Sequence, residues 1–180
     1  MTALAATVAR RPAHRAAPID LGSLARAAVG LVGFGFTVAI TLAIVRFLAG
    51  LAPSHPNTQN LAVLIHVSAV LPAVPLGGWL MLARKGTPRH KQLGKVWVVL
   101  MVVTAISALF IRQINGGQFS PIHLFVPLVL HGAWKTVSTA RRGDIAGHKK
   151  ALIGFYLGAL TIPGLFAFLP DRLMGTWLFG

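Results

Sequence analysis

The chain has 180 residues, of which 55% are hydrophobic and 11% charged, with 17 Lys and Arg against 3 Asp and Glu. A soluble domain carries about 25% charged residues because water must wet its surface, so this composition excludes an ordinary soluble protein and indicates a membrane protein. The basic residues lie in short tracts between apolar runs, which argues against nucleic-acid binding, and the absence of cysteine excludes disulfides and thiolate metal sites.

A basic tail and five long apolar segments follow one another along the chain. The tail covers residues 1–23 and precedes a single transmembrane domain over residues 24–180. A helix needs about 20 apolar residues to cross ~30 Å of hydrocarbon, and backbone groups in lipid must be satisfied within the segment. The sequence therefore predicts an all-α integral membrane bundle of about five transmembrane helices, with spans near 24–51, 60–83, 93–114, 121–140 and 150–169.

The distribution of Lys and Arg predicts the orientation of these helices. Most of these residues lie in the tail, in residues 84–95 and in residues 135–150, whereas the other loops hold Arg46, Arg112 and Arg172. Cytoplasmic loops are enriched in Lys and Arg. We therefore expect a multi-pass protein of the bacterial inner membrane, with its N-terminus in the cytoplasm and its C-terminus in the periplasm. The tail is expected to contact other membrane subunits or anionic lipid headgroups.

An internal repeat appears when the two basic loops are aligned. Each loop has a basic pair followed by glycine, at 84–86 and 141–143, and each continues into a His-Lys pair. Helices two and three therefore look like one unit, and helices four and five like its copy. Parallel repeats of this kind occur in membrane folds. The repeat makes two pairs of histidines equivalent: His66 with His123, and His90 with His148.

These four histidines are the candidate ligands of a cofactor. An imidazole inside a membrane helix is costly, so intramembrane histidines are functional candidates. Two histidines on facing helices can ligate haem iron from both sides through neutral ring nitrogens. The sequence therefore predicts haem b between His66 and His123, and a second haem between His90 and His148. The alternative for His66 and His123 is that they only form hydrogen bonds between helices, each worth about 0.6 kcal/mol. The alternative for His90 and His148 is that they are solvated side chains of basic loops.

Three further residues bear on the expected haem sites. Haem propionates favour cations near the membrane edge, and Arg112 is available outside the membrane, as is Arg46. His131 is a rival ligand on the same helix as His123, but the repeat selects His123. We therefore assign His131 to packing or to a hydrogen bond.

The sequence resembles a known family in its histidines and basic tracts. The run 84–94, with His66 upstream and 142–144 with His148 downstream, resembles bacterial predicted membrane proteins of domain-of-unknown-function family 2306 over about residues 60–170. That resemblance implies no established activity. The histidine layout is also similar to that of ascorbate-reducible transmembrane cytochromes b, whose four core helices carry two haems ligated from alternate helices. This second resemblance implies the two pairings given above and transmembrane electron transfer.

Three functions stay open after the acids are considered. Asp20, Asp144 and Asp171 are the only acids and none lies within a predicted span, which argues against proton pumps and carboxylate metal sites. No hydrolytic or transferase site is evident. The first function is a haem b electron carrier. The second is a non-catalytic accessory subunit of a respiratory or photosynthetic complex, held by its tail and by close helix packing at Gly154 and Gly158. The third is a small transporter.

Overall fold

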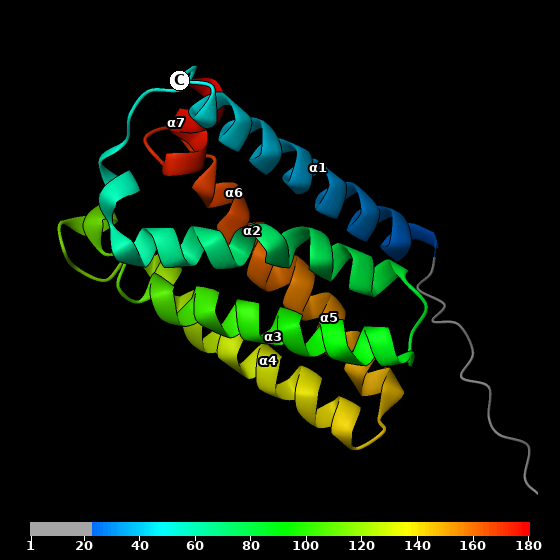
Figure 1. The fold of residues 1–180 in the computed structure, drawn as a ribbon. Helices are drawn as coiled ribbons and strands as arrows, with labels where there is room; N and C mark the ends of the chain where they lie inside the picture. The colour runs from blue at the N-terminus through cyan, green and yellow to red at the C-terminus, as the bar shows by residue number, and fades with distance from the viewer. Residues whose placement is uncertain (1–22) are drawn as a thin grey trace, which may run out of the picture.

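The computed structural model describes residues 23–180, and every regular element in this part of the chain is helical (Figure 1). Residues 1–22 of the predicted tail lie outside the described residues. Three short turns, η1 (Pro56–Gln59), η2 (Gln113–Asn115) and η3 (Pro121–Leu124), are 3-10 helical, and η4 (Leu157–Thr161) is π-helical. The α-helices are α1 (Ser23–Leu48), α2 (Leu61–Leu82), α3 (Pro88–Ala108), α4 (Phe125–Arg141), α5 (Ile145–Tyr156), α6 (Ile162–Ala167) and α7 (Leu173–Phe179).

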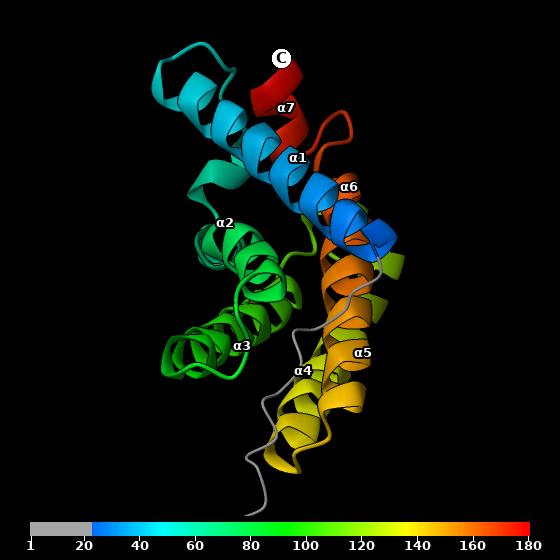
Figure 2. The ribbon, with the colours of Figure 1, turned by 90° about the vertical axis from the view of Figure 1, so that its right-hand side faces the viewer.

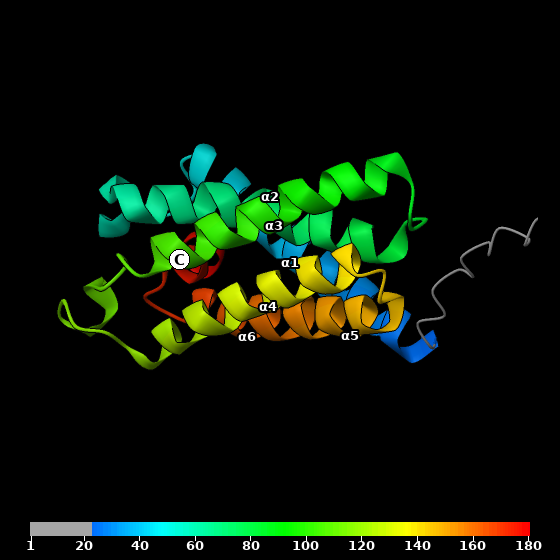
Figure 3. The same ribbon diagram turned by 90° about the horizontal axis from the view of Figure 1, so that it is seen from below.

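The long helices form two antiparallel pairs with α1 lying across them. α2 packs along α3, α4 packs along α5, and α3 also contacts α4 (Figure 3). α1 crosses over α2, as the side view shows (Figure 2). The α2–α3 and α4–α5 connections lie at the same end of the bundle as the start of α1 (Figure 1), and we call it the basic end because it carries both basic tracts. In this arrangement α2 lies diagonal to α4, and α3 to α5.

Four helical segments are long and apolar enough to cross a membrane, judged by length and composition within the described residues. They are α1 from Leu24, α2, α3, and the continuous segment from α5 through η4 to α6. The fourth predicted span, 121–140, is helical as predicted, but it consists of η3 followed by an α4 of only 17 residues. The all-α multi-spanning architecture is therefore confirmed for the described part of the chain.

Two helices begin about five residues earlier than the hydropathy predicts. α3 begins at Pro88 and not near 93, because the Thr87 hydroxyl accepts a hydrogen bond from the backbone N–H of His90 at 3.1 Å. α5 begins at Ile145 and not near 150, because the Asp144 carboxylate accepts from the N–H of Gly147 at 2.8 Å. Both are N-caps that satisfy orphan donors of the first turn. Each cap brings a histidine into the first turns of its helix.

A π-helical turn interrupts the last long segment. It covers Leu157–Thr161 and lies directly before Pro163. Proline has no backbone N–H and crowds the carbonyl four residues earlier, so a local widening of the helix accommodates it. The Thr161 hydroxyl within this turn is buried and has no hydrogen-bond partner in the structure.

Aromatic side chains fill the middle of the bundle. Trp97 and Tyr156 are each 1% exposed, and each donates a hydrogen bond to a carbonyl of α2, at Ala73 (2.9 Å) and Val74 (3.0 Å). A Cβ at Gly77 would lie 2.6 Å from both aromatic side chains. Glycine is therefore required there for the close approach of α2 to α3 and α5. These contacts fix the relative positions of three helices around one core.

The C-terminal helix α7, which the hydropathy did not predict, packs against the far end of α1. Phe47 and Trp177 stack with ring centroids 4.2 Å apart. The Arg46 guanidinium donates to the carbonyls of Trp177 at 3.1 Å and Gly180 at 2.6 Å. A small second core of Ala43, Met174 and Trp177 lies beneath this contact. Arg46, expected to face a haem propionate, instead binds the end of α7.

Candidate functional site

The sequence-predicted histidines divide between the two ends of the bundle. His90 in α3 and His148 in α5 lie at the basic end, and we call them the basic-end pair. His66 in α2 and His123 in η3 lie toward the other end, and we call them the opposite-end pair. Within each pair the histidines come from helices that lie diagonally across the bundle. The two pairs therefore lie at different ends of the bundle.

In the basic-end pair, a backbone hydrogen bond orients His148. His148 Nδ1 lies 2.9 Å from the carbonyl oxygen of Thr136 in α4. A carbonyl can only accept, so the Nδ1 of neutral His148 carries the proton and its Nε2 keeps a free lone pair. His90 lies within electrostatic reach of His148, and its own Nδ1 is buried without a hydrogen-bond partner. The hydroxyl of Thr136 is likewise buried without a partner.

The aromatic core brings together the faces of α3 and α5 that carry His90 and His148. Trp97 follows His90 by seven residues, and Phe155 follows His148 by seven residues. Seven residues are about two helical turns, so each aromatic residue shares a helix face with its histidine. Trp97 and Phe155 meet edge to face with ring centroids 5.0 Å apart. The facing stripes of α3 and α5 are thus in contact about two turns inside the histidines.

Lys85 and Arg26 add positive charge beside the basic-end pair. Lys85 Nζ donates to the carbonyls of Leu80 at 2.7 Å and Ala83 at 2.8 Å, and also to Met81 O. It therefore caps the C-terminal end of α2. Partial burial lowers the pKa of Lys85 to about 8, and the charge of Arg26 in α1 adds to the lowering. The basic end thus carries cations contributed by α1 and by the α2–α3 connection.

At the opposite end, His66 has its Nδ1 engaged. This atom lies 2.9 Å from the carbonyl oxygen of Thr104 and 3.3 Å from the hydroxyl of Ser107, both in α3. The carbonyl requires a donor, so Nδ1 carries the proton in the neutral ring and Nε2 keeps its lone pair. His66 is therefore arranged like His148, with a backbone carbonyl that fixes the tautomer and leaves one nitrogen available as a ligand.

His123 has the reverse arrangement. Its Nδ1 accepts a hydrogen bond from the backbone N–H of Ser120 at 3.0 Å, as part of a capping box at the start of η3. A neutral ring whose Nδ1 accepts must carry its proton on Nε2. That Nε2 is buried and has no partner in the structure. His123 could ligate a metal only after its proton moves to Nδ1, where the carbonyl of Ser120 at 3.1 Å would accept it.

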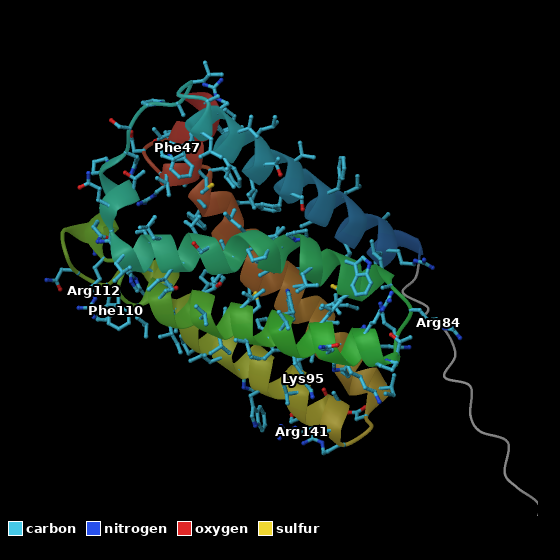
Figure 4. All side chains as sticks on the ribbon, viewed as in Figure 1. Phe47, Arg84, Lys95, Phe110, Arg112 and Arg141 are labelled. Atoms are coloured by element: carbon cyan, nitrogen blue, oxygen red, sulfur yellow. The ribbon has the colours of Figure 1, made fainter. Side chains whose placement is uncertain are left out.

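Arg112 and His131 occupy different surroundings from the paired histidines. The guanidinium carbon of Arg112 lies 4.2 Å from the ring centroid of Phe119, which in turn meets His123 edge-on at 5.0 Å. Arg112 therefore lies at the opposite end of the bundle (Figure 4), with the ring of Phe119 between it and His123. His131 is exposed on α4 and contacts Trp134, with ring centroids 5.7 Å apart.

The residues at the basic end fit bis-histidine ligation of haem better than those at the opposite end. The basic-end pair offers a fixed Nε2 on His148 and an unpaired buried nitrogen on His90. The opposite-end pair offers one ligand-ready ring and one ring in the wrong tautomer. Within residues 23–180 no cluster of three or more His, Cys, Asp or Glu side chains could hold a metal ion. A two-histidine site is thus the arrangement that these residues can supply.

The residues that orient these histidines gave little signal in the sequence. Thr104 and Thr136 act through backbone carbonyls, which every residue has, so only the helix packing reveals them. Ser120 was recognisable, because a serine three residues before His123 matches the spacing of a capping box.

The chain was compared with known proteins and families. No curated protein and no solved structure matches it. A family described as predicted membrane proteins (DUF2306) matches residues 63–176, which agrees with the resemblance and the extent expected from the sequence. With four helices able to cross a bilayer, the protein is a multi-spanning membrane protein in contact with lipid. The chain belongs to the DUF2306 family of predicted membrane proteins.

Proposed function

We propose that this protein binds haem b through His90 and His148 and passes electrons across the membrane. One observation carries the proposal: the carbonyl of Thr136 fixes His148 with its proton on Nδ1, and the diagonal helix carries His90, whose Nδ1 is buried without a partner. A buried polar atom without a partner costs about 1–3 kcal/mol, so it calls for an explanation in a bound group or in water. Ligation of a metal by His90 would supply that explanation.

The chain's own residues would do three things for such a group. The Thr136 carbonyl holds the proton of His148 on Nδ1, which keeps Nε2 basic and correctly aimed. Arg26 and Lys85 supply positive charge for carboxylates at the membrane edge. Trp97 and Phe155 fill the bundle on the inner side and exclude water there. Haem b itself would supply a one-electron carrier whose potential the histidines set.

A second haem at the opposite end is the further part of this proposal. His66 is ready as a ligand there, and Arg112 lies at the same end as a partner for propionates. The aromatic core between the two pairs would separate two carriers on the two sides of the membrane. Ligation by His123 would require the loss of the capping hydrogen bond that the Ser120 N–H donates to its Nδ1. We therefore expect the opposite-end site to bind haem more weakly than the basic-end site.

The proposed topology has five crossings in the bacterial inner membrane. Together η3 and α4 run from Pro121 to Arg141, which at about 1.5 Å per residue is close to the ~30 Å of the hydrocarbon. α4 also lies antiparallel to α3 and α5, so it must cross wherever they do. The basic end would face the cytoplasm and α7 the periplasm, following the enrichment of Lys and Arg in cytoplasmic loops. The two antiparallel pairs would be copies of one repeat.

An absorption spectrum of the purified protein tests the function directly. The full chain is purified from membranes grown with a haem supply, and spectra are recorded oxidised and after dithionite. We expect a reduced b-type signal that His90→Ala and His148→Ala each remove. His131→Ala is the matched control, since His131 is exposed on α4 and should leave the signal unchanged. If the unmutated protein shows no haem signal, the proposal is wrong.

A non-catalytic accessory subunit is the second candidate, and an outward small-residue stripe favours it. A Cβ at Gly154 in α5 or at Gly158 in η4 would meet nothing within 4 Å, so this small-xxx-small pair does not serve packing inside the bundle. Such pairs promote close contact between membrane helices. Another subunit could pack there, with the tail as a second contact. Replacing both glycines by Leu, or deleting residues 1–22, should then release co-purifying membrane subunits while the bundle stays folded.

A further inference from the structure

A groove runs along the outer surface of the bundle between α3 and α4. Val98 and Val102 of α3 form one wall, and Trp134, Val137 and Arg141 of α4 belong to the other. Its volume is about 360 Å³, within the range of about 300–1,000 Å³ typical of small-molecule sites. Trp134 is 63% exposed, so the groove opens away from the bundle core. None of its lining residues belongs to either histidine pair, and in the proposed topology it faces the lipid.

The groove has an apolar body and a cationic mouth. Lys95 precedes Val98 by three residues and Val102 by seven, so it continues the same stripe of α3 toward the basic end. Arg141 ends α4 on the facing wall (Figure 4). The two cations therefore flank the groove where it reaches the basic end. The carboxylate nearest in sequence, Asp144, is engaged as the N-cap of α5.

The length of the groove matches one leaflet of a bilayer. Leu130, the lining residue of α4 that is farthest from the basic end, lies eleven residues before Arg141. At about 1.5 Å per residue this is ~16 Å, roughly half of the ~30 Å hydrocarbon core. Tryptophan is enriched close to the headgroup level, and Lys and Arg attract anionic headgroups there. An acyl chain along the valines would place a headgroup phosphate between Lys95 and Arg141.

We propose that the α3–α4 groove is a binding site for an anionic phospholipid such as phosphatidylglycerol. The phosphate lies between Lys95 and Arg141, and one acyl chain follows Val98 and Val102 beside the indole of Trp134. The proposal is independent of haem binding, because none of these residues belongs to either histidine pair.

Quenching of Trp134 by brominated lipid tests the site. Trp97 and Trp177 are buried, so Trp79→Phe leaves Trp134 as the one exposed tryptophan in residues 23–180. This variant of the full chain is reconstituted in phosphatidylcholine bilayers that contain a minor fraction of brominated phosphatidylglycerol or brominated phosphatidylcholine. We expect brominated phosphatidylglycerol to quench Trp134 more strongly at equal content. A cation near the membrane surface contributes about 1 kcal/mol, so Arg141→Gln should lower the preference about fivefold.

The matched control is Arg142→Gln. Arg142 is also exposed and follows Arg141 directly, but it does not line the groove. It should leave the preference unchanged, whereas Lys95→Gln on the facing wall should lower it. Equal quenching by both lipids overturns the proposal, and so does an equal loss in Arg141→Gln and Arg142→Gln, which would indicate diffuse attraction. Relief of quenching by inorganic phosphate would show that the site takes a soluble anion and would overturn the lipid assignment.

Discussion

The two ends of the bundle use the same residue type in opposite ways. At the basic end, a carbonyl of α4 fixes His148 with its proton on Nδ1, which leaves Nε2 open. At the opposite end, a backbone N–H fixes His123 with its proton on Nε2. Both histidines belong to the pairs that the sequence predicts, yet their hydrogen-bond partners give them different chemistry. Whether one ring nitrogen of a histidine can ligate a metal thus depends on the hydrogen bond that the other ring nitrogen makes.

The largest expected effect is on haem content. His90→Ala and His148→Ala should each remove most of the reduced b-type signal, whereas His66→Ala and His123→Ala should keep more than half of it. The reason is that His123 must change its tautomer to ligate, whereas His148 already has its Nε2 open and no hydrogen bond holds His90 in another tautomer. Haem per chain is measured by the pyridine haemochrome assay on protein of equal purity. If His66→Ala and His123→Ala removed more haem than His90→Ala and His148→Ala, the opposite end would be the stronger haem site.

The tautomers themselves can be measured. In protein without haem, ¹⁵N NMR of the imidazole rings should place the proton of neutral His66 and His148 on Nδ1 and that of His123 on Nε2. Single His→Gln variants assign the signals. A proton on Nδ1 of His123 would remove the difference between the ends, and the opposite-end site would then be as ready to ligate as the basic-end site.

Two substitutions that each remove a hydroxyl test the comparison between the two ends through the free energy of unfolding. Thr136→Val removes a buried hydroxyl without a partner, so the free energy of unfolding should rise by about 1 kcal/mol in haem-free protein. Ser107→Ala removes a hydroxyl that donates within α3 and contacts His66, so the free energy should fall by about 0.5 kcal/mol. Both are measured by denaturant unfolding in one detergent. A loss in Thr136→Val would mean that its hydroxyl has a partner, such as an ordered water.

The smallest effect concerns pH. The pKa of Lys85 is lowered to about 8, against about 10.4 for a free lysine side chain. Between these two values the unfolded chain binds more protons at Lys85 than the folded chain does. Stability should therefore rise as pH increases from 8 to about 10. The thermal midpoint of the wild type should gain more over this window than that of Lys85→Met, and an equal gain in both would assign the effect to other groups.

Much of the fold was predictable because apolar runs determine where membrane helices lie. The starts of α3 and α5 were placed too late because basic residues fill their first turns, although Thr87 and Asp144 mark both caps in the sequence. α7 was missed because it is short and is held by Arg46, a contact over 131 residues that no local pattern reveals.

The site was predictable only in part. The sequence indicated which histidines lie toward the same end of the bundle. It could not indicate which nitrogen of each ring is free, because that depends on carbonyls of neighbouring helices, such as Thr136 for His148. The capping box at Ser120 was the one local sign that His123 differs from His66.

The contact between Arg46 and α7 also orders the assembly of the protein in time. α1 leaves the ribosome first, and the carbonyl that Arg46 binds is made 131 residues later. During that interval Arg46 has only the carbonyl of Leu51 among its three backbone partners. α1 can pack on α2 early, but its contact with α7 closes late in synthesis, and nascent chains stalled before Trp177 would present an arginine without its last two partners to the machinery that inspects membrane proteins.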